Sequence, residues 1–351
     1  MKSVKTPKLS ICISTLDREE LLKELIESIL DQKCSDIEIV VSDGGSQDNT
    51  CKLMESFESN NHNIKFINPG RHVGLDEGYH MAVIGSSGDY IWCMPDDDYI
   101  LPDALSTIIK SLKNEDNIDF LIVNLRCYTN DLKTDLNQNL IPIFEDKTMS
   151  FDEFKDIFSE NIYGLSYMGT HILKREIWFE NNPEDFYDSW FGTFAAMGES
   201  KLINVVRYLN EPIIYYRSAC SCWTEHSFEI WYKIWPGLVN KFGLFSSKIK
   251  QNPEILYPWL RGFSLLKSRA MGEFNFNCYT KYIKDNPNAS LLTHFYSILI
   301  SFLPIWILNT SVLLAMLIFK RTYLYAIYTM AMSSPTPNLA IRISSFFGIK
   351  F

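Results

Sequence analysis

Cysteine is scarce in this chain, and its few cysteines are widely scattered. Eight occur in 351 residues, too sparse a distribution for a fold held together by disulfides. Cys220 and Cys222 form one C-x-C pair, but no second pair lies nearby to complete a structural zinc site. We therefore expect reduced thiols, and zinc at this pair is the disfavoured interpretation.

The chain also lacks an excess of positive charge and a secretory leader. Its formal net charge is −9, so no overall basic field attracts nucleic acid. The opening stretch MKSVKTPKLSICIST contains no long apolar segment and no small-residue cleavage site. These absences favour a cytoplasmic protein without nucleic-acid partners. An acidic protein that handles an acidic substrate usually needs a metal ion or a local basic cluster.

The first 125 residues alternate strand-like and helix-like segments. Short apolar runs alternate with amphipathic segments that carry capping residues. The expected strands are 9–14, 37–42, 63–68, 89–94 and 120–125, and the expected helices are 18–32, 46–57, 74–87 and 102–114. This order predicts an α/β fold with a mostly parallel sheet and helices on both faces. Ligands of such sheets bind beyond the carboxyl ends of the strands.

The regular pattern weakens after residue 126. The polar stretch 127–142 is expected to be a loop, and residues 151–226 mix short strands and helices with many aromatics. Aromatic residues recur at helical spacing in SFEIWYKIWPGLVNKF, residues 227–242. Such a stripe is more often core packing than a binding surface, so we interpret it as core.

The carboxyl-terminal part contains a long apolar segment without charge. Residues 295–319 include no Asp, Glu, Lys or Arg, but Pro304 and the cluster Asn309-Thr310-Ser311 interrupt them. A cap at Thr310 or Ser311 would divide the segment into two short apolar helices. Three interpretations stay open: association with the membrane interface, a true span, or a buried dimer core. Anionic headgroups have candidate partners in Lys281, Lys284, Arg321, Arg342 and Lys350.

Three consecutive aspartates, Asp96, Asp97 and Asp98, end the expected fourth strand. Carboxylates are the ligands that Mg²⁺ and Mn²⁺ prefer, usually one or two of them beside substrate phosphates. The alternative is an acidic cap for the helix that Pro102 opens. Because side chains alternate along an extended chain, we expect Asp96 and Asp98 to point one way and Asp97 the other.

A further aspartate, Asp43, ends the expected second strand and precedes two glycines. A carboxylate at this place accepts hydrogen bonds from a base or ribose in nucleotide-binding sheets. The alternative is an ordinary strand-to-helix turn. Asp43 and the Asp96–Asp98 cluster are expected at the same edge of the sheet, and this pairing favours a nucleotide-and-metal site over either alternative.

These motifs together resemble the family 2 glycosyltransferases of GT-A fold. The likeness covers about the first 125 residues and rests on LSICISTLDREELLKELIESILDQ, IEIVVSDGGSQDNT and GRHVGLDEGYHMAVIGSSGDYIWCMPDDDYILPDAL. It implies a hexosyltransferase that moves a sugar from a nucleotide-diphosphate sugar with inversion at the anomeric carbon. It further implies that Thr15 lines the nucleotide pocket, Asp43 contacts the base, Asp96 lies by the ribose and Asp97 binds Mg²⁺ or Mn²⁺.

The chain departs from the family's pattern at three positions. Ser14 and Asp17 stand where the family's PTYNR has proline and asparagine, and Pro95 replaces the first aspartate of its DSDD. In the later part, EPIIYYR followed by SFEIWYKIWPGL resembles bacterial O-antigen members near the abequosyltransferase-like group. That group implies a lipid-linked saccharide acceptor at the cytoplasmic face of the membrane, which agrees with the apolar carboxyl-terminal segment.

An inverting transfer needs a base that takes the proton of the acceptor hydroxyl. The stretch NNPEDFYDSWFGTF supplies Glu184, Asp185 and Asp188. We favour Asp185 and then Asp188, with a solvated loop acid as the alternative for each. His226 is a candidate late metal ligand and Arg71 a candidate for meeting phosphate charge. A polar loop histidine and a surface arginine are the corresponding alternatives.

The sequence thus predicts three parts. Residues 1–225 are expected to form the GT-A domain, with a nucleotide-sugar half at 1–125 and an acceptor half at 126–225. Residues 226–290 are expected to be a helical extension, and residues 291–351 apolar helices associated with the membrane. Two rival functions stay open: a nucleotide-binding scaffold without turnover, and a nucleotidyltransferase. The second is disfavoured because STLDREELL lacks a glycine-rich basic loop.

Overall fold

The computed structural model describes residues 6–114, 117–143, 145–161, 164–180, 182–198, 200–220, 226–242, 247–250, 256–319 and 324–351. The chain divides into two compact units, residues 1–126 with 139–216 and residues 127–138 with 217–351. Each unit is described by itself below. The divisions expected at residues 225 and 290 stay predictions from the sequence.

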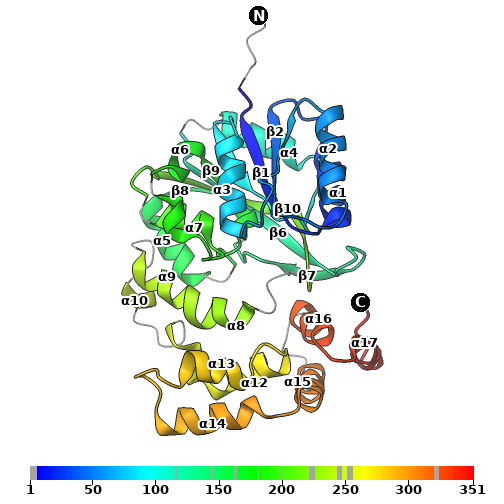
Figure 1. The fold of residues 1–351 in the computed structure, drawn as a ribbon, viewed down its shortest axis with the longest axis vertical. Coiled ribbons are helices and arrows are strands. Elements are labelled where there is room, and N and C mark those ends of the chain that lie inside the picture. The colour runs from blue at the N-terminus through cyan, green and yellow to red at the C-terminus, as the bar shows by residue number, and fades with distance from the viewer. Residues whose placement is uncertain are drawn as a thin grey trace, which may run out of the picture. The chain divides into compact units, whose positions relative to one another are not determined.

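One mixed sheet forms the centre of the first unit (Figure 1). Ten strands of the described residues contribute to it: β1 (Leu9–Thr15), β2 (Ile37–Asp43), β3 (Ile64–Ile67), β4 (Tyr90–Cys93), β5 (Tyr99–Ile100), β6 (Phe120–Tyr128), β7 (Asp135–Asn139), β8 (Lys147–Ser150), β9 (His171–Lys174) and β10 (Val205–Arg217). Their order is β3-β2-β1-β4-β9-β6-β10-β5, with β7 beside β6 and β8 beside β10. The pairs β2–β3, β1–β2 and β1–β4 are parallel, whereas β9 is antiparallel to β4 and β6.

Helices pack against this sheet and position its carboxyl edge. Those of the first unit are α1 (Glu19–Leu30), α2 (Thr50–Asn60), α3 (Leu75–Gly85), α4 (Ala104–Asn114), α5 (Phe151–Glu160), η1 (Met168–Thr170), α6 (Arg175–Trp178), η2 (Pro183–Phe186) and α7 (Gly192–Gly198). Helix α3 packs across β1 and β2. Gly78 permits this close approach, because a Cβ added there would lie 2.1 Å from the Ser14 hydroxyl oxygen.

The α/β fold and the strands expected in the first 125 residues are confirmed, and two other local expectations are corrected. The stretch 127–142 is not simply a loop, since β6 extends to Tyr128 and β7 pairs with it. Helix α4 begins at Ala104 rather than Pro102, because Asp103 has a left-handed φ of 63° that a right-handed helix excludes. The described cysteines are all free thiols, as expected, and Cys222 lies outside the described residues.

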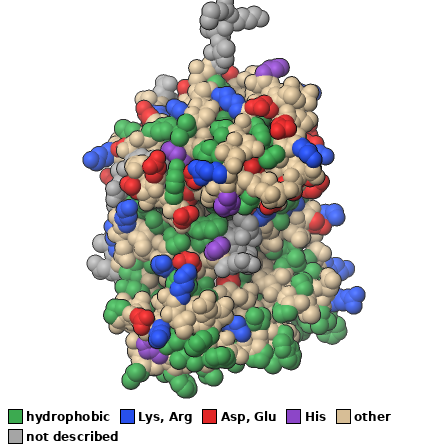
Figure 2. Space-filling view, in the orientation of Figure 1, with side chains coloured by type: hydrophobic (Ala, Val, Ile, Leu, Met, Phe, Trp, Pro, Cys, Tyr) green, Lys and Arg blue, Asp and Glu red, His purple; other side chains and the backbone are tan. Residues whose placement is uncertain are grey.

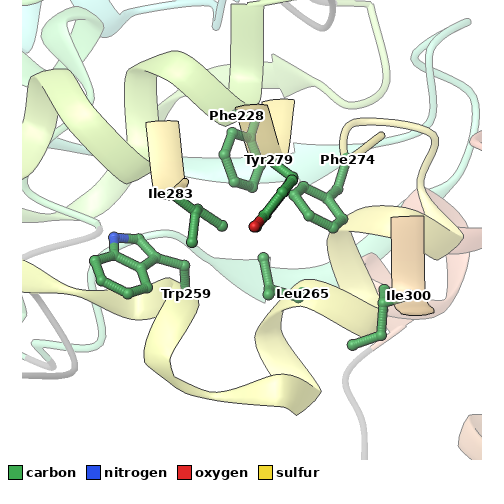
Figure 3. Packing of buried hydrophobic residues seen from close by; sticks show 7 residues of the cluster. All are labelled: Phe228, Trp259, Leu265, Phe274, Tyr279, Ile283 and Ile300. Atoms are coloured by element: carbon green, nitrogen blue, oxygen red, sulfur yellow. The ribbon is translucent and has the colours of Figure 1, made fainter. Parts of the chain in front are cut away.

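The second unit is mainly helical. Its described helices are α8 (Ser227–Glu229), η4 (Ile230–Ile234), α9 (Trp235–Lys241), α10 (Ser247–Lys250), η5 (Pro258–Leu260), α12 (Gly262–Ala270), α13 (Phe276–Cys278), η6 (Tyr279–Ile283), α14 (Leu291–Ser301), α15 (Ile305–Phe319), α16 (Leu324–Met332) and α17 (Pro337–Phe346). The aromatic stripe of residues 227–242 is core, as expected, since Phe228 and Trp235 are buried. Figure 3 shows Phe228 in a cluster where Ile283, Tyr279 and Leu265 point toward one another. A second cluster joins α12, α15, α16 and α17.

The apolar carboxyl-terminal segment forms two helices, as expected. The break lies at Pro304, whereas the expected interruption at residues 309–311 does not end a helix. Helix α14 ends before Pro304, and α15 begins directly after it. Thr310 does not cap a new helix: it lies inside α15, and its hydroxyl donates to the Trp306 carbonyl at 2.8 Å. Within the described residues no single helix is long and apolar enough to cross a bilayer, and α14 and α15 meet that test only as a pair bent by 102°.

Candidate active site

The carboxyl ends of β1, β2 and β4 meet at one edge of the sheet. Thr15, the last residue of β1, lies opposite Asp43, the last residue of β2. On the other side of β1, Cys12 lies opposite Cys93, the last residue of β4. The aspartates that follow β4 therefore lie near Thr15. Parallel neighbours end on the same side of a sheet, which is where α/β proteins bind their ligands. The structure thus brings together the three segments that the sequence selected.

Asp43 is buried and is held by its own turn. Its Oδ2 accepts hydrogen bonds from the backbone N–H groups of Gly45 at 2.9 Å and Ser46 at 3.0 Å, and the Cys51 thiol lies 3.5 Å away. Gly45 has a φ of 98°, so glycine relieves the strain of this left-handed turn. Oδ1 receives only a longer bond of 3.3 Å from Ser46. This oxygen retains most of its acceptor capacity, and contact with a base stays a prediction.

Asp96 and Asp97 form the turn that follows β4, and each contacts a residue at or just after the end of β1. The Thr15 hydroxyl donates to Asp96 Oδ2 at 2.8 Å, and Arg18 Nη1 lies 3.4 Å from Asp97 Oδ2. Burial, together with the negative charge of Asp97, raises the pKa of Asp96 to about 7. The expected alternation of side chains is wrong here because residues 96 and 97 are a turn rather than a strand. Both carboxylates consequently face the β1 side.

Asp98 is neither a ligand candidate nor a helix cap. It is fully buried, and the Tyr167 hydroxyl donates to its Oδ2 at 2.5 Å. The idea that Asp98 caps the helix after Pro102 is therefore wrong. Pro95 packs next to the same region, since a Cβ added to Gly169 would lie 3.0 Å from Pro95 Cδ. Pro95 thus fills space against η1.

The segment before α3 lies against the Asp43 turn. The Val73 N–H donates to the Gly44 carbonyl at 3.1 Å, and a Cβ on Gly45 would lie 3.1 Å from His72 Cα. Arg71 is therefore close to the Asp43 turn in the fold. Its guanidinium is exposed and contacts both carboxylate oxygens of Glu77, at 2.5 and 3.2 Å. A role in binding phosphate would require Arg71 to exchange or share this partner.

Asp76 is a buried acid that sequence reasoning missed. Its carboxylate accepts hydrogen bonds from the Trp190 N–H at 2.8 Å, the Gly192 N–H at 3.0 Å and the Ser189 hydroxyl at 3.3 Å. Burial raises its pKa to about 6 despite these donors. A signal was present in the sequence, because Asp76 falls on the face of α3 that Tyr79, His80 and Val83 bury.

Asp76 ties residues 189–192 to α3, directly after Asp188 in the chain. Asp188 and Trp190 both have left-handed backbones, with φ of 64° and 65°. The Asp188 carboxylate lies next to the start of α3, where a Cβ on Gly74 would be 3.2 Å from Asp188 Oδ1. Asp185 and Glu184 lie one turn earlier, in η2, and are exposed. The structure thus brings Asp188, rather than Asp185, beside the segment that contacts the Asp43 turn.

His226 belongs to the second unit, where it is exposed directly before α8. Its role as a metal ligand stays a prediction. Among the described residues, no group of three or more His, Cys, Asp or Glu side chains is arranged to hold a metal ion. Two adjacent carboxylates at a strand end nevertheless suit Mg²⁺ or Mn²⁺, which complete their coordination with water and substrate phosphates. The donor set at Asp96 and Asp97 therefore fits such an ion.

Comparison with known proteins agrees with this arrangement. A family model described as Glycosyl transferase family 2 matches residues 10–176. The chain carries a glycosyl transferase family 2 domain. The matched residues include Asp43, Asp96 and Asp97 and stop short of Asp188. The resemblance expected from the sequence is confirmed.

Two curated bacterial relatives are similar to parts of this chain. The GalNAc(5)-diNAcBac-PP-undecaprenol beta-1,3-glucosyltransferase of Campylobacter jejuni is 34% identical over 105 residues, which are 30% of this chain and 34% of that protein. The abequosyltransferase RfbV of Salmonella typhimurium is 29% identical over 229 residues, 59% of this chain and 65% of the relative. The chain therefore matches only about a third to two thirds of the lengths of these relatives.

Solved structures show the same fold. The crystal structure of S. aureus TarS 1-349 in complex with UDP superposes with a TM-score of 0.54 at 19% sequence identity, over 76% of this chain and 78% of that one. At this identity the likeness concerns the fold alone. It confirms the GT-A type α/β architecture expected for the family 2 domain.

Proposed function

We propose that this protein is a glycosyltransferase that moves a sugar from a nucleotide-diphosphate sugar to a saccharide acceptor with inversion. The observation that carries the proposal is the joint placement of Asp43, Asp96 and Asp97 at the edge where the parallel strands β1, β2 and β4 end, in contact with the end of β1 or the residues just after it. Carboxylates at this edge suit recognition of a nucleoside and coordination of a diphosphate-bound cation. Thr15 positions Asp96 by the hydrogen bond between their side chains.

Asp97, with Asp96 beside it, is the candidate ligand of Mg²⁺ or Mn²⁺. A divalent cation bound there supplies positive charge that stabilises the departing diphosphate. Arg18 Nη1 lies 3.4 Å from Asp97 Oδ2 and helps to hold this carboxylate near the end of β1. Arg71 is a further cation beside the Asp43 turn and is suited to contact phosphate oxygens.

Asp188 is the candidate general base. A base takes the proton from the acceptor hydroxyl while the new bond forms at the anomeric carbon, on the face opposite the departing diphosphate. Asp188 is preferred to Asp185 because it lies beside Gly74, in a segment whose backbone Asp76 holds. His226 stays a candidate for closing over the diphosphate.

The acceptor is proposed to be a lipid-linked saccharide at the cytoplasmic face of the cell membrane. Support comes from the Campylobacter relative, whose name includes PP-undecaprenol, and from the similarity to the Salmonella abequosyltransferase, since the resemblance to that group implies an O-antigen role. The proposed role is therefore in the synthesis of bacterial surface polysaccharide, such as the O-antigen of lipopolysaccharide.

The test is release of nucleoside diphosphate from a panel of nucleotide sugars with Mn²⁺, with Mg²⁺ and with chelator. Asp97→Asn and Asp188→Asn should each lower turnover by about a hundredfold or more. Asp103→Asn is the matched control, because this aspartate is exposed and its own carboxylate has no described role at the edge. Full activity of Asp97→Asn in chelator would exclude the proposed metal role.

A nucleotide-binding protein without turnover is the second candidate. The observation that favours it is the Arg18–Asp97 ion pair, in which the arginine already contacts the carboxylate assigned to the cation. Calorimetry separates the two functions. Donor binding with no turnover on any donor, with or without lipid-linked acceptor, would support the scaffold.

A further inference from the structure

Helix α14 exposes its apolar side chains and buries its polar ones, the reverse of the usual arrangement for a helix in water. Its large apolar side chains lie outward, with Leu292, Phe295 and Phe302 exposed to 70%, 67% and 65%. Its small polar residues, Thr293, Ser297 and Ser301, recur every four residues and are buried. A helix in water normally buries its apolar stripe and exposes its polar one. Leu291 and Leu299 extend the exposed stripe along the helix.

The buried side of α14 is held by contacts of Tyr296 and Ile300 with neighbouring residues, so its orientation follows from the packing. The Tyr296 hydroxyl donates to the carbonyls of Trp259 and Leu260 at 3.1 and 2.7 Å. Ile300 belongs to the core cluster of Figure 3. Turning α14 by half a turn would break these bonds and remove Ile300 from the core. The apolar stripe therefore stays outward in the folded unit.

Helix α15 continues the exposed apolar surface around the bend. Trp306 and Ile307 in its first turn are exposed, as is Ile318 near its end. The two helices meet at 102°, and a pair of helices at this angle can lie flat on one plane. Figure 2 shows apolar side chains gathered along the edge of the second unit where Figure 1 places α14 and α15. We call the surface made by the exposed apolar residues of α14 and α15 the α14–α15 face; it consists of Leu291, Leu292, Phe295, Ile298, Leu299, Phe302, Trp306, Ile307 and Ile318.

Residues 261–351 carry more basic than acidic side chains, whereas the whole chain has a negative net charge. Between residues 261 and 351 the sequence has nine Lys or Arg residues against two Asp or Glu residues, in a chain of net charge −9. Lys281, on the helix η6 that packs against α14, is exposed, and so is Lys284 directly after it. Lys267 is exposed on α12, which also packs against α14. Exposed cations thus lie on or next to helices that pack against α14, and one of them, Lys281, also pairs with Glu229 at 3.4 Å.

We propose that the α14–α15 face docks on the surface of a bilayer that contains anionic lipid, with the aromatic and aliphatic side chains inserted below the headgroups. Apolar faces flanked by Lys and Arg bind such membranes through both insertion and charge. Trp306 suits the boundary because its ring is apolar and its N–H is polar. A second copy of the chain is a poorer occupant, since the cations on these neighbouring helices would repel those of the other copy when the faces meet.

The inference extends the membrane part of the proposed function, but its test measures lipid binding alone. Its failure would leave the sugar-transfer chemistry untouched, and loss of transfer would leave vesicle binding untouched. The full chain is mixed with vesicles of phosphatidylcholine, with or without phosphatidylglycerol, and separated by flotation. We expect binding to the mixed vesicles that weakens at high salt and on omission of phosphatidylglycerol.

A matched pair of double variants isolates the face. Leu292→Ser with Phe295→Ser should lower the vesicle partition coefficient by about tenfold or more. Ile84→Ser with Phe179→Ser, an aliphatic and an aromatic residue of the first unit that are exposed to 57% and 43%, should leave it unchanged. Because all four side chains are exposed, thermal unfolding should not shift in either variant. Equal vesicle binding by both variants and the wild type would overturn the proposal.

Two further measurements complete the test. Lipids brominated on the acyl chain should quench a fluorescence component that is lost in Trp306→Phe, and no such loss would place Trp306 outside the bilayer. Sedimentation without lipid should give a monomer for the wild type. A wild-type dimer that Leu292→Ser with Phe295→Ser dissociates, without vesicle binding, would assign the face to a second copy and overturn the proposal.

Discussion

Replacing Asp76 by asparagine tests whether this buried carboxylate positions the segment that carries Asp188. The carboxylate accepts bonds from two backbone N–H groups and one hydroxyl between residues 189 and 192. Asparagine has the same shape, but its amide NH₂ cannot accept a hydrogen bond. At least one of the three donors must then lose its partner or move. We expect the segment to loosen around the two left-handed residues, Asp188 and Trp190.

The cost in stability can be estimated from the structure. A buried donor left without a partner costs about 1–3 kcal/mol. Burial raises the pKa of Asp76 from 3.8 to about 6, so ionisation at pH 7.5 costs the folded state about 3 kcal/mol, which the neutral asparagine avoids. These two effects largely cancel. The free energy of unfolding should therefore change by less than about 2 kcal/mol at pH 7.5, while the position of Asp188 is lost.

The raised pKa also predicts a dependence on pH with a defined sign. As pH falls, Asp76 takes up its proton near pH 6 in the folded state but only near pH 3.8 in the unfolded state. The wild type consequently gains stability between pH 6 and pH 4, and the Asn variant lacks this gain. The free energy of unfolding of the wild type minus that of the variant should rise by up to about 3 kcal/mol over this interval.

Three measurements test whether Asp76 positions the segment that carries Asp188. Urea unfolding at pH 7.5 and pH 5 yields the stability difference, and hydrogen exchange reports the amides of Trp190 and Gly192. Turnover should fall by about ten- to hundredfold in kcat with little change in the donor KM. Asp103→Asn should change none of these quantities. If the Asn variant exchanges these amides and turns over like the wild type, Asp76 does not position the segment.

Two other substitutions test the geometry of the edge. Gly78→Ala should destabilise the protein by about 1–3 kcal/mol in urea unfolding, because the new Cβ would lie 2.1 Å from the Ser14 hydroxyl oxygen. Adding Ser14→Ala should recover part of this loss. A Gly78→Ala variant more stable than the wild type would contradict the close contact. Arg18→Gln should lower the Kd for Mn²⁺ roughly two- to fivefold in calorimetry, since it removes a cation that is partnered with Asp97. An unchanged Kd would show that this ion pair does not compete with the metal.

The part of the site that the sequence predicted depends on local pattern. Each strand from β1 to β4 is followed by its own helix or turn, so the alternation of short segments places Thr15, Asp43 and Asp96 at strand ends without knowledge of the rest. Parallel pairing then brings those ends to one edge. Only the turn at residues 96 and 97 departed from the expected extended chain, because the strand stops at Cys93.

What the sequence did not reveal depends on contacts between distant segments. β9 enters the sheet between β4 and β6, far from them in the chain, and its antiparallel pairing has no local signature. The same insertion explains Pro95: its neighbour Gly169 belongs to η1, directly before β9. Asp76 is a similar case. The sequence pattern predicts that Asp76 lies on the buried face of α3, but its hydrogen-bond partners lie more than a hundred residues later in the chain.

Helix α14 shows why periodicity alone cannot assign a helix to a membrane or to a core. The pattern of Leu292, Phe295, Leu299 and Phe302 identifies residues that share one face, whatever lies outside that face. A reader of the sequence would place this stripe inward and Ser297 outward, and the structure does the reverse. Helical periodicity reports which side chains lie together, whereas burial reports which of the two faces the rest of the protein covers. The exposed apolar face therefore indicates that something binds there, and the cations on the helices packed against α14 indicate that this binding partner is anionic.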